Sequence, residues 1–286
     1  MDFEKKHQED LQRLRGFRLL DDDFMTKVFE DISCAELLLR IILNDEGIRV
    51  LEAHSQRGIK NLQERSVKLD ILAVDSHNRV FNVEVQRSDR GAGAKRVRYN
   101  SALIDANVTE PGDQYEDLNE TFVIFITEND VMKAGLPIYH IDRVVRETGK
   151  LFEDEEHIIY VNSQIKDETK LGRLMHDFSC TDAKDMYNKV LADRVRYFKE
   201  DERGVEIMCR EMEIMRNQAH EEGIEKGRIM QLIKQVCVKM QKFSSAEEVA
   251  NDLVEQDVPL IQKIMNVAPD FAPDYNVNDI YNALKL

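Results

Sequence analysis

Two neighbouring apolar segments each carry one acidic residue, and this pattern suggests metal chemistry. Asp70 lies in Lys-Leu-Asp-Ile-Leu-Ala-Val, and Glu84 lies in Val-Phe-Asn-Val-Glu-Val-Gln. The Asp-Ser-His-Asn run at 75–78 is typical of a turn, so the segments predict a β-hairpin that brings the two acids close together. Because side chains alternate between the faces of a strand, Glu84 and Gln86 share a face and can both point toward Asp70.

A pair of carboxylates on adjacent strands is suited to binding a hard divalent cation. Mg2+ binds one or two carboxylates together with water and phosphate oxygens, and the backbone carbonyl of Val85 can complete such a set. In the alternative interpretation, Asp70 and Glu84 are ordinary hairpin acids paired with Arg65 or Lys68. An acid inside an apolar strand loses solvation, so a metal or a cationic partner would have to offset that cost.

A basic segment follows the second acid directly. Between residues 87 and 98 a single acid, Asp89, stands against the basic residues Arg87, Arg90, Lys95, Arg96 and Arg98. These side chains are candidates for phosphate contacts, and solvated charges at an exposed helix start are the alternative. The whole chain has a formal net charge of -15, which argues against nonspecific adhesion to nucleic acid.

Helical and extended patterns alternate around the hairpin. Apolar spacing predicts a helix at about 34–44, and a Gly-Ala-Gly run opens another predicted helix that ends near residue 108. Residues 121–127 are apolar on both faces, which favours a central strand, and further strands are expected at 137–144 and 157–161. The region 48–66 fits no single period. The alternation indicates an α/β or α+β domain with a mixed sheet.

The character of the sequence changes to helical after residue 181. We expect three parts: an α/β domain at 1–181, a long helical segment at 182–243 and a small helical module at 244–286. Apolar stripes on the long segment predict core-facing packing or, alternatively, an oligomerisation arm. We therefore expect a homodimer.

Several other classes of protein and site are excluded by their missing signals. No apolar run approaches the ~18 residues of a membrane span, and the polar start is unlike a signal peptide, so a cytoplasmic protein is expected. The four cysteines contain no Cys-x-x-Cys pair, which leaves buried thiols as the interpretation. The Gly223 and Gly227 segment lacks the ending of a phosphate-binding loop, so no nucleotide cofactor is expected.

The motifs taken together resemble the PD-(D/E)xK family transposases, relatives of the recombination-promoting nucleases. Asp70, thirteen further residues and then Glu84-Val85-Gln86 match the core signature, with Gln where Lys is usual. The resemblance extends roughly over residues 20–200. It rests on five ordered strings that begin at Arg65, Asn82, Lys95, Phe125 and Leu174.

The resemblance implies a restriction-endonuclease-like αβββαβ core with a mixed sheet, followed by an α-helical C-terminal region. It also implies DNA endonuclease activity that depends on Mg2+ or Mn2+ and is linked to transposition or recombination. In this role Asp70, Glu84 and the Val85 carbonyl would hold the metal, which polarises the phosphate and lowers the pKa of a bound water. Gln86 would lie near that water, keeping the hydrogen-bond donor of the usual Lys but losing its charge.

The resemblance also suggests a third acid and a set of DNA contacts. Asp23 matches an early Asp-Phe segment of the family and is the expected catalytic acid from the preceding helix, while Glu36 is an alternative and an N-cap is the structural interpretation of Asp23. The expected DNA-binding residues are Arg65, Lys68, Arg87, Lys95, Arg96 and Arg98. Two other functions remain open: a catalytically degenerate module that binds DNA or protein, and a protein that serves only oligomerisation.

Overall fold

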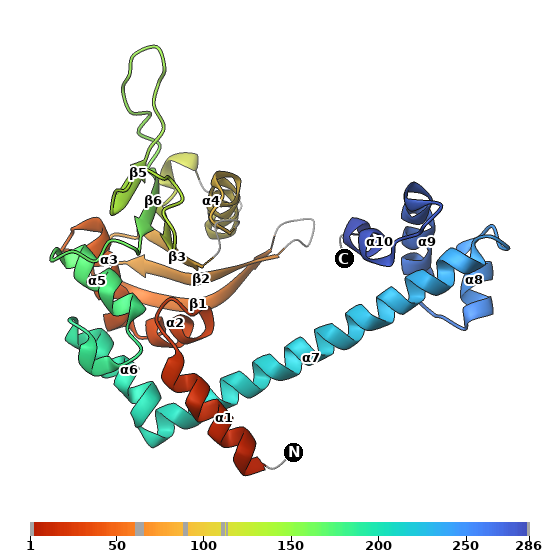
Figure 1. Cartoon of the computed structure of the whole chain (residues 1–286). Helices are drawn as coiled ribbons and strands as arrows, with labels where there is room; N and C mark the ends of the chain where they lie inside the picture. The colour runs from red at the N-terminus through yellow and green to blue at the C-terminus, as the bar shows by residue number, and fades with distance from the viewer. Residues whose placement is uncertain (1–2, 61–65, 88–90, 110–111, 113, 285–286) are drawn as a thin grey trace. The chain divides into compact units, whose positions relative to one another are not determined.

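The computed structural model of the chain describes residues 3–60, 66–87, 91–109, 112 and 114–284, and it divides into two compact units. The first unit is Met1–Cys209 and the second is Arg210–Leu286. Helix α7 (Glu202–Lys239) begins in the first unit and continues in the second (Figure 1). The domain limits derived from the sequence stay a prediction.

The first unit contains a six-stranded sheet and helices on both of its faces. Its strands are β1 (Val50–Lys60), β2 (Ser66–Asp75), β3 (Val80–Gln86), β4 (Thr121–Thr127), β5 (Ile138–Ile141) and β6 (Glu156–Asn162). Its α-helices before α7 are α1 (Phe3–Gly16), α2 (Asp22–Phe29), α3 (Ile32–Leu43), α4 (Ala94–Val108), α5 (Lys170–Ser179) and α6 (Lys189–Glu200). Short 3-10 turns lie at η2 (Tyr115–Asp117) and η3 (Ala183–Asp185).

The sheet has mixed strand directions, as the sequence predicts. Its strand order is β1-β2-β3-β4-β6-β5, with β3, β4 and β6 parallel and the other pairs antiparallel. Along the chain, α3, β1, β2, β3, α4 and β4 follow in order. The αβββαβ core and the mixed α/β class are therefore confirmed.

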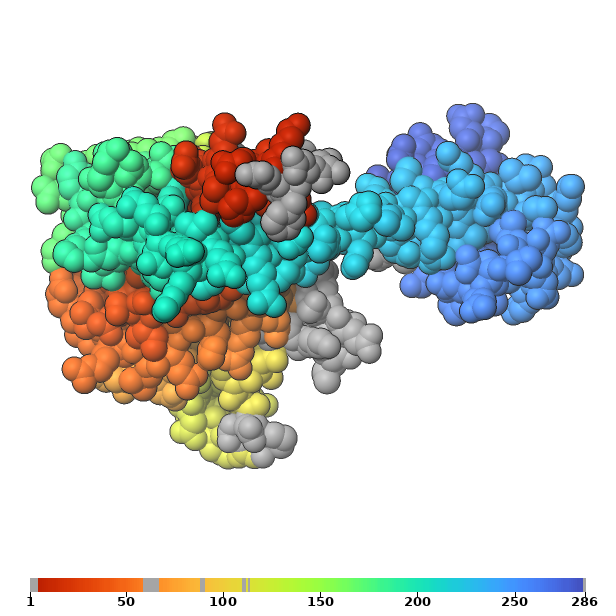
Figure 2. Space-filling model, turned by 90° about the horizontal axis from the view of Figure 1, so that it is seen from below, coloured from red at the N-terminus to blue at the C-terminus, as the bar shows by residue number. Residues whose placement is uncertain are grey.

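Apolar side chains cover both faces of this sheet. On one face, α4 contributes Val97 and Ile104 to a core with Leu72, Val123 and Phe125. On the other face, α2 and α3 contact β1 and pack with α5 and α6. Phe29 of α2, for example, stacks on Phe178 of α5, with ring centroids 5.7 Å apart. In Figure 2, α1 (red) and α6 (blue-green) lie at the surface of the first unit beside earlier segments in orange.

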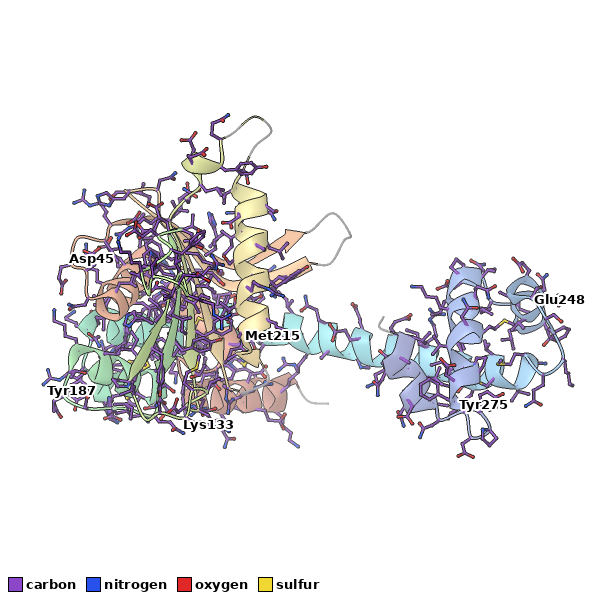
Figure 3. The ribbon with its side chains drawn as sticks, turned by 90° about the horizontal axis from the view of Figure 1, so that it is seen from above. Asp45, Lys133, Tyr187, Met215, Glu248 and Tyr275 are labelled. Carbon is purple, nitrogen blue, oxygen red and sulfur yellow. The ribbon has the colours of Figure 1, made fainter. Side chains whose placement is uncertain are left out.

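The second unit is a small helical bundle with its own apolar core. The C-terminal half of α7 packs with α8 (Ala246–Leu253), α9 (Val258–Val267), η4 (Ala268–Phe271) and α10 (Val277–Leu284). Ser245 and Glu248, the latter labelled in Figure 3, form a reciprocal capping box that starts α8. None of the described helices in either unit is long and apolar enough to cross a membrane.

Candidate active site

The two acids of the hairpin meet where β2 and β3 separate. The β2–β3 register runs from Val74 and Val80 to Ile71 and Val83 and ends there, immediately before Asp70 and Glu84. On the other side of β2, the pairing with β1 is interrupted at Gln56, the residue opposite Asp70. Gln56 has a left-handed φ of 49°. Irregular pairing on both sides leaves the backbone near Asp70 available for other hydrogen bonds.

The carboxylates of Asp70 and Glu84 fill the gap between these strands through reciprocal contacts. The Asp70 backbone N–H donates to Glu84 Oε1 at 3.4 Å, and the Val85 N–H donates to Asp70 Oδ2 at 2.9 Å. Each acid therefore receives a backbone N–H from the strand that carries the other. The hairpin brings the two acids together, as their positions in the sequence suggest.

Glu84 has two further partners from different elements. Its side chain is 0% exposed, and Asn82, two residues earlier on the same strand, donates from Nδ2 to Oε1 at 3.0 Å. Arg96 in the first turn of α4 donates to Oε2 at 2.7 Å. Arg96 also donates to the Gly91 carbonyl at 3.1 Å, so the guanidinium is held from two sides.

The electrostatics of the pair favour protonation when no cation is bound. Burial, followed by the charges of Glu84 and Asp22, raises the pKa of Asp70 from 3.8 to about 8. Burial also raises the pKa of Glu84, although the hydrogen bond from Asn82 and the charge of Arg96 act in the opposite direction. The site therefore carries more negative charge than its own donors stabilise.

One acid from the preceding helix, Asp22, acts on this pair. Its charge raises the pKa of both Asp70 and Glu84, and its own pKa is raised by partial burial and then by the charge of Asp23. Asp23, the acid suggested by the family motif, lies one residue further along α2, and its charge raises the pKa of Asp22.

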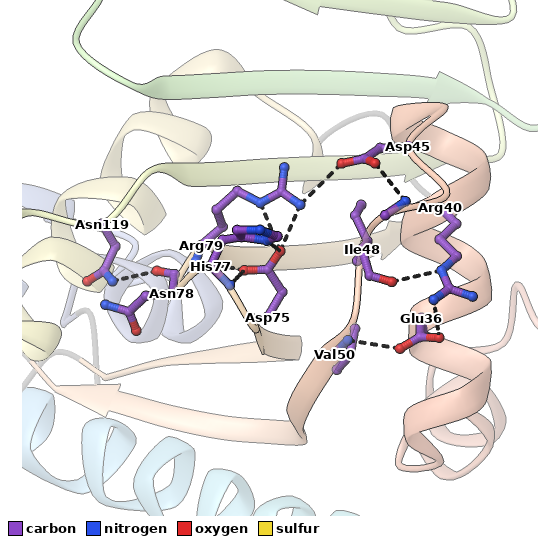
Figure 4. Close-up of polar contacts among 11 residues, drawn as sticks. Glu36, Arg40, Asp45, Ile48, Val50, Asp75, His77, Asn78, Arg79 and Asn119 are labelled. Carbon is purple, nitrogen blue, oxygen red and sulfur yellow. Dashed lines mark hydrogen bonds and ion pairs between the residues drawn. The ribbon is translucent and has the colours of Figure 1, made fainter.

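Glu36, the other helix acid considered, lies at a different place in the unit. Its carboxylate accepts from the Val50 N–H at 3.0 Å and pairs with Arg40 at 2.7 Å (Figure 4). Val50 is the partner of Asp75 at the far end of β2, whereas Asp70 lies in the middle of that strand. Glu36 therefore connects α3 to the start of β1.

Gln86, at the position where Lys is usual, packs closely against Gly91. A Cβ atom at Gly91 would lie 1.7 Å from Gln86 Oε1 and 3.4 Å from an Arg96 guanidinium nitrogen. Any larger residue at position 91 would push the Gln86 amide away from this position between β3 and the start of α4. The amide of Gln86 and the charge of Arg96 are consequently neighbours.

The predicted DNA-binding residues differ in how available they are. Lys68, Lys95 and Arg98 are exposed, whereas Arg96 binds Glu84. Arg87 is also exposed, but it pairs with Asp21 at 2.8 Å and with Glu128 at 3.2 Å, which ties β3 to other segments. Arg65 lies outside the described residues.

The chemistry of the donor set fits a hard divalent cation. Asp22, Asp70 and Glu84 offer carboxylate oxygens, which Mg2+ and Mn2+ prefer over nitrogen or sulfur ligands. A bound cation would offset both the burial and the neighbouring charges of Glu84 and Asp22, which together raise the pKa of Asp70. Val85 contributes its N–H to Asp70 and pairs with Ile126 of β4.

A second cluster of metal-type ligands has a structural explanation. Within the described ranges, the ligand atoms of His176, Asp177 and Cys180 all lie within 4.8 Å of one another. The buried Asp177, however, accepts from the N–H groups of Tyr187 at 2.7 Å and Asn188 at 2.8 Å, and from the Asn188 side chain at 2.8 Å. Burial raises the pKa of the Cys180 thiol to about 11. These residues fix the segment between α5 and α6.

Sequence reasoning missed Asn82 and the pairing of Arg96 with Glu84. Asn82 is a fully buried polar residue inside an apolar strand, and its equal parity with Glu84 is the signal that could have identified it. Behind it, Asn100 of α4 donates to Asn82 Oδ1 at 3.4 Å. The Arg96 contact depends on where α4 crosses the sheet, which no local pattern specifies.

A comparison with known protein families agrees with this arrangement. The sequence profile of the PD-(D/E)XK nuclease family transposases matches residues 36–222. That range contains Asp70, Glu84 and Arg96, while Asp22 precedes it. No curated protein and no solved structure matches the chain. With the larger part of its length matched by that profile, the chain belongs to the PD-(D/E)XK nuclease family transposases.

Proposed function

We propose that this chain is a metal-dependent DNA endonuclease that hydrolyses phosphodiester bonds in transposition or recombination. The observation that carries the proposal is the meeting of the Asp70 and Glu84 carboxylates between two separating strands. The pKa of Asp70, about 8, is raised by burial and then by the negative charges of Glu84 and Asp22. Family membership supports a nuclease fold and a DNA substrate.

In this proposal Asp70, Glu84 and the Val85 carbonyl hold Mg2+ or Mn2+, and Asp22 adds a third acid beside them. The cation supplies Lewis-acid stabilisation of the phosphate and a lowered pKa of a coordinated water. The hydrogen bond from Asn82 keeps the Glu84 carboxylate oriented toward Asp70. The N–H of Val85 does the same for the Asp70 carboxylate.

Gln86 and Arg96 together perform what one Lys does in the usual signature. Gln86 retains a hydrogen-bond donor for a water or a phosphate oxygen, and Arg96 supplies positive charge next to it. Their closeness at Gly91 supports this division of the role. The departure from the usual Lys is therefore compatible with catalysis.

The exposed Lys68, Lys95 and Arg98 are proposed to contact the DNA backbone. Lys95 and Arg98 lie on α4, the helix that carries Arg96, and Lys68 lies two residues before Asp70. Phosphate contacts of this kind position the duplex without reading its sequence. Arg87 would have to leave Asp21 and Glu128 before it could bind phosphate. Arg65 stays in the proposed set from the sequence alone.

The direct test is plasmid cleavage by the purified full chain with Mg2+ or Mn2+. We expect Asp70→Ala to abolish cleavage, because it removes a metal ligand from the centre of the site. Glu36→Gln is the control, since Glu36 contacts Val50 and Arg40 away from the Asp70–Glu84 pair and its replacement should leave cleavage unchanged. Equal activity of Asp70→Ala and the wild type would overturn the proposal.

The second candidate is a catalytically degenerate module that binds DNA or protein. It is favoured by the absence of the usual Lys and by Arg96, which already neutralises Glu84 at 2.7 Å. Calorimetric titration with Mn2+ separates the candidates. A folded protein that binds DNA without binding Mn2+ or cleaving would support the degenerate module.

A further inference from the structure

The contact between Arg96 and Glu84 occupies an oxygen that a metal would need. Glu84 Oε1 already accepts from Asn82 and from the Asp70 backbone, and Oε2 accepts from Arg96 at 2.7 Å. A cation that binds Glu84 through Oε2 meets the positive charge of the Arg96 guanidinium at the same oxygen. The group that neutralises Glu84 therefore competes with a metal for it.

Arg96 is held in a way that allows such a displacement. Its side chain is 38% exposed, although the carboxylate it contacts is fully buried. Its guanidinium lies over the ring of Phe125 at 6.0 Å and donates to the Gly91 carbonyl at 3.1 Å. Because the Arg96 side chain is partly exposed, its charge can leave Glu84 without being buried elsewhere.

A phosphate group offers Arg96 a replacement partner. Lys95 precedes it on α4 and Arg98 follows two residues later, and both are exposed. Guanidinium groups bind phosphate oxygens with the same paired geometry that they use for carboxylates. An anionic backbone near this part of α4 therefore competes with Glu84 for Arg96.

From these contacts we propose that Arg96 couples metal binding to DNA binding by exchanging Glu84 for a backbone phosphate. Without DNA, Arg96 stays on Glu84 and weakens the site for a divalent cation. With DNA, the phosphate holds Arg96 and frees Glu84 for the metal. The inference rests on the metal site proposed above. By thermodynamic linkage, each ligand then raises the affinity for the other by the same factor.

The experiment is a calorimetric Mn2+ titration of the full chain with and without a short duplex whose linkages are phosphorothioates. These linkages keep the backbone charge and resist hydrolysis. Titrations are made above the pKa of Asp70, about 8, so that a proton on Asp70 does not compete with Mn2+. In the wild type, the duplex should raise the Mn2+ affinity by about tenfold, within the usual range of coupling between sites.

The informative variant is Arg96→Gln. Without duplex it should bind Mn2+ about tenfold more tightly than the wild type, and the duplex should give little further increase. A gain in affinity cannot result from damaged folding, which would weaken binding. Arg40→Gln is the matched control, because Arg40 pairs with Glu36 at the same distance of 2.7 Å but outside the site. It should leave both affinities unchanged.

The outcomes separate this inference from the proposed nuclease function. An Arg96→Gln variant that binds Mn2+ no more tightly than the wild type without duplex would overturn the exchange, as would the absence of Mn2+ binding in both proteins. If the predicted affinities are found but plasmid DNA is not cut, the exchange stands and the nuclease proposal fails.

Discussion

The strand β2 carries two acids, Asp70 and Asp75, and they differ in how many hydrogen-bond donors surround each carboxylate. Asp75, at the end of the strand, is fully buried and receives four donors: the N–H groups of His77 and Arg79 and two guanidinium nitrogens of Arg79 (Figure 4). Burial raises the pKa of Asp75, but these hydrogen bonds lower it by more, so the net shift is downward. Asp75 is a satisfied structural anion.

Asp70, five residues earlier, has the opposite balance. It receives one backbone N–H, from Val85, and it faces the charges of Glu84 and Asp22. Arg96 forms its ion pair with Glu84, and its charge lowers the pKa of Asp70 by less than burial and the two neighbouring acids raise it. The comparison shows that burial of an acid near an arginine does not identify a functional site. What distinguishes the candidate active site is negative charge in excess of the available donors.

The surroundings of Asp75 also differ in their overall charge. A cavity of about 540 Å3 opens beside its ion pair and is lined by Asp45, Asp117, Glu120 and Glu155 together with His77 and Arg79. These acids would repel a phosphate backbone. The cavity is therefore a poor candidate for DNA, despite its size.

The largest effect should come from breaking the satisfied pair. Arg79→Met leaves Asp75 buried without its cationic partner, so the free energy of unfolding should fall by about 3–5 kcal/mol. Urea unfolding of the full chain measures this loss. Lys170→Met is the control: its contact with Glu46 is on the surface, with the Lys170 side chain 70% exposed, and no measurable change is expected. A loss for Arg79→Met as small as that control would remove the distinction between the two acids.

A smaller effect of opposite sign is expected at Asp70. Between about pH 4 and pH 8, native Asp70 holds a proton that the unfolded chain has released, so stability without metal should fall as the pH rises. Asp70→Asn should reduce this slope and stabilise the protein at pH 8 by on the order of 1 kcal/mol or more. Denaturant unfolding at several pH values measures both quantities.

The variant Asp75→Asn is the control for that slope. The pKa of Asp75 is lowered, so its contribution is present above its unfolded pKa and is lost only as the pH falls through its folded pKa. Its removal should reduce stability without changing the slope between pH 5 and pH 8. An unchanged slope in Asp70→Asn would show that Asp70 is already ionised in the native protein.

The sequence predicts best the elements whose residues are buried on both faces. Strand β4, Thr121–Thr127, has the predicted bounds because seven residues that are all buried leave few other interpretations. The class of the fold followed from the alternation of such segments. Strand β1 was not assigned, because it forms the edge of the sheet and residues such as Glu52 and His54 break the apolar pattern.

The sequence predicted less of the site than of the fold. The proximity of Asp70 and Glu84 follows from one hairpin, which is a local structure. The contact of Arg96 with Glu84 instead requires α4 to cross the sheet. The role of the fully buried Asn82, which donates to the same carboxylate, is visible only once the elements are packed. Interactions between elements distant in sequence depend on their packing, which local periodicity does not determine.

The choice between Asp22 and Asp23 provides the smallest and most local test. Successive residues on a helix point about 100° apart, so these acids at the start of α2 cannot serve the same site equally. Because the charge of Asp22 acts on both Asp70 and Glu84, Asp22→Asn should weaken Mn2+ binding by about 1 kcal/mol, or roughly fivefold. Asp23→Asn should have a smaller effect, although it removes the same charge from the same helix terminus and so controls for the helix dipole.

Calorimetry with Mn2+ compares the two variants directly. A larger loss in Asp23→Asn would favour the acid suggested by the family motif and would show that the effect of Asp22 on the pKa values of the pair does not identify the third ligand.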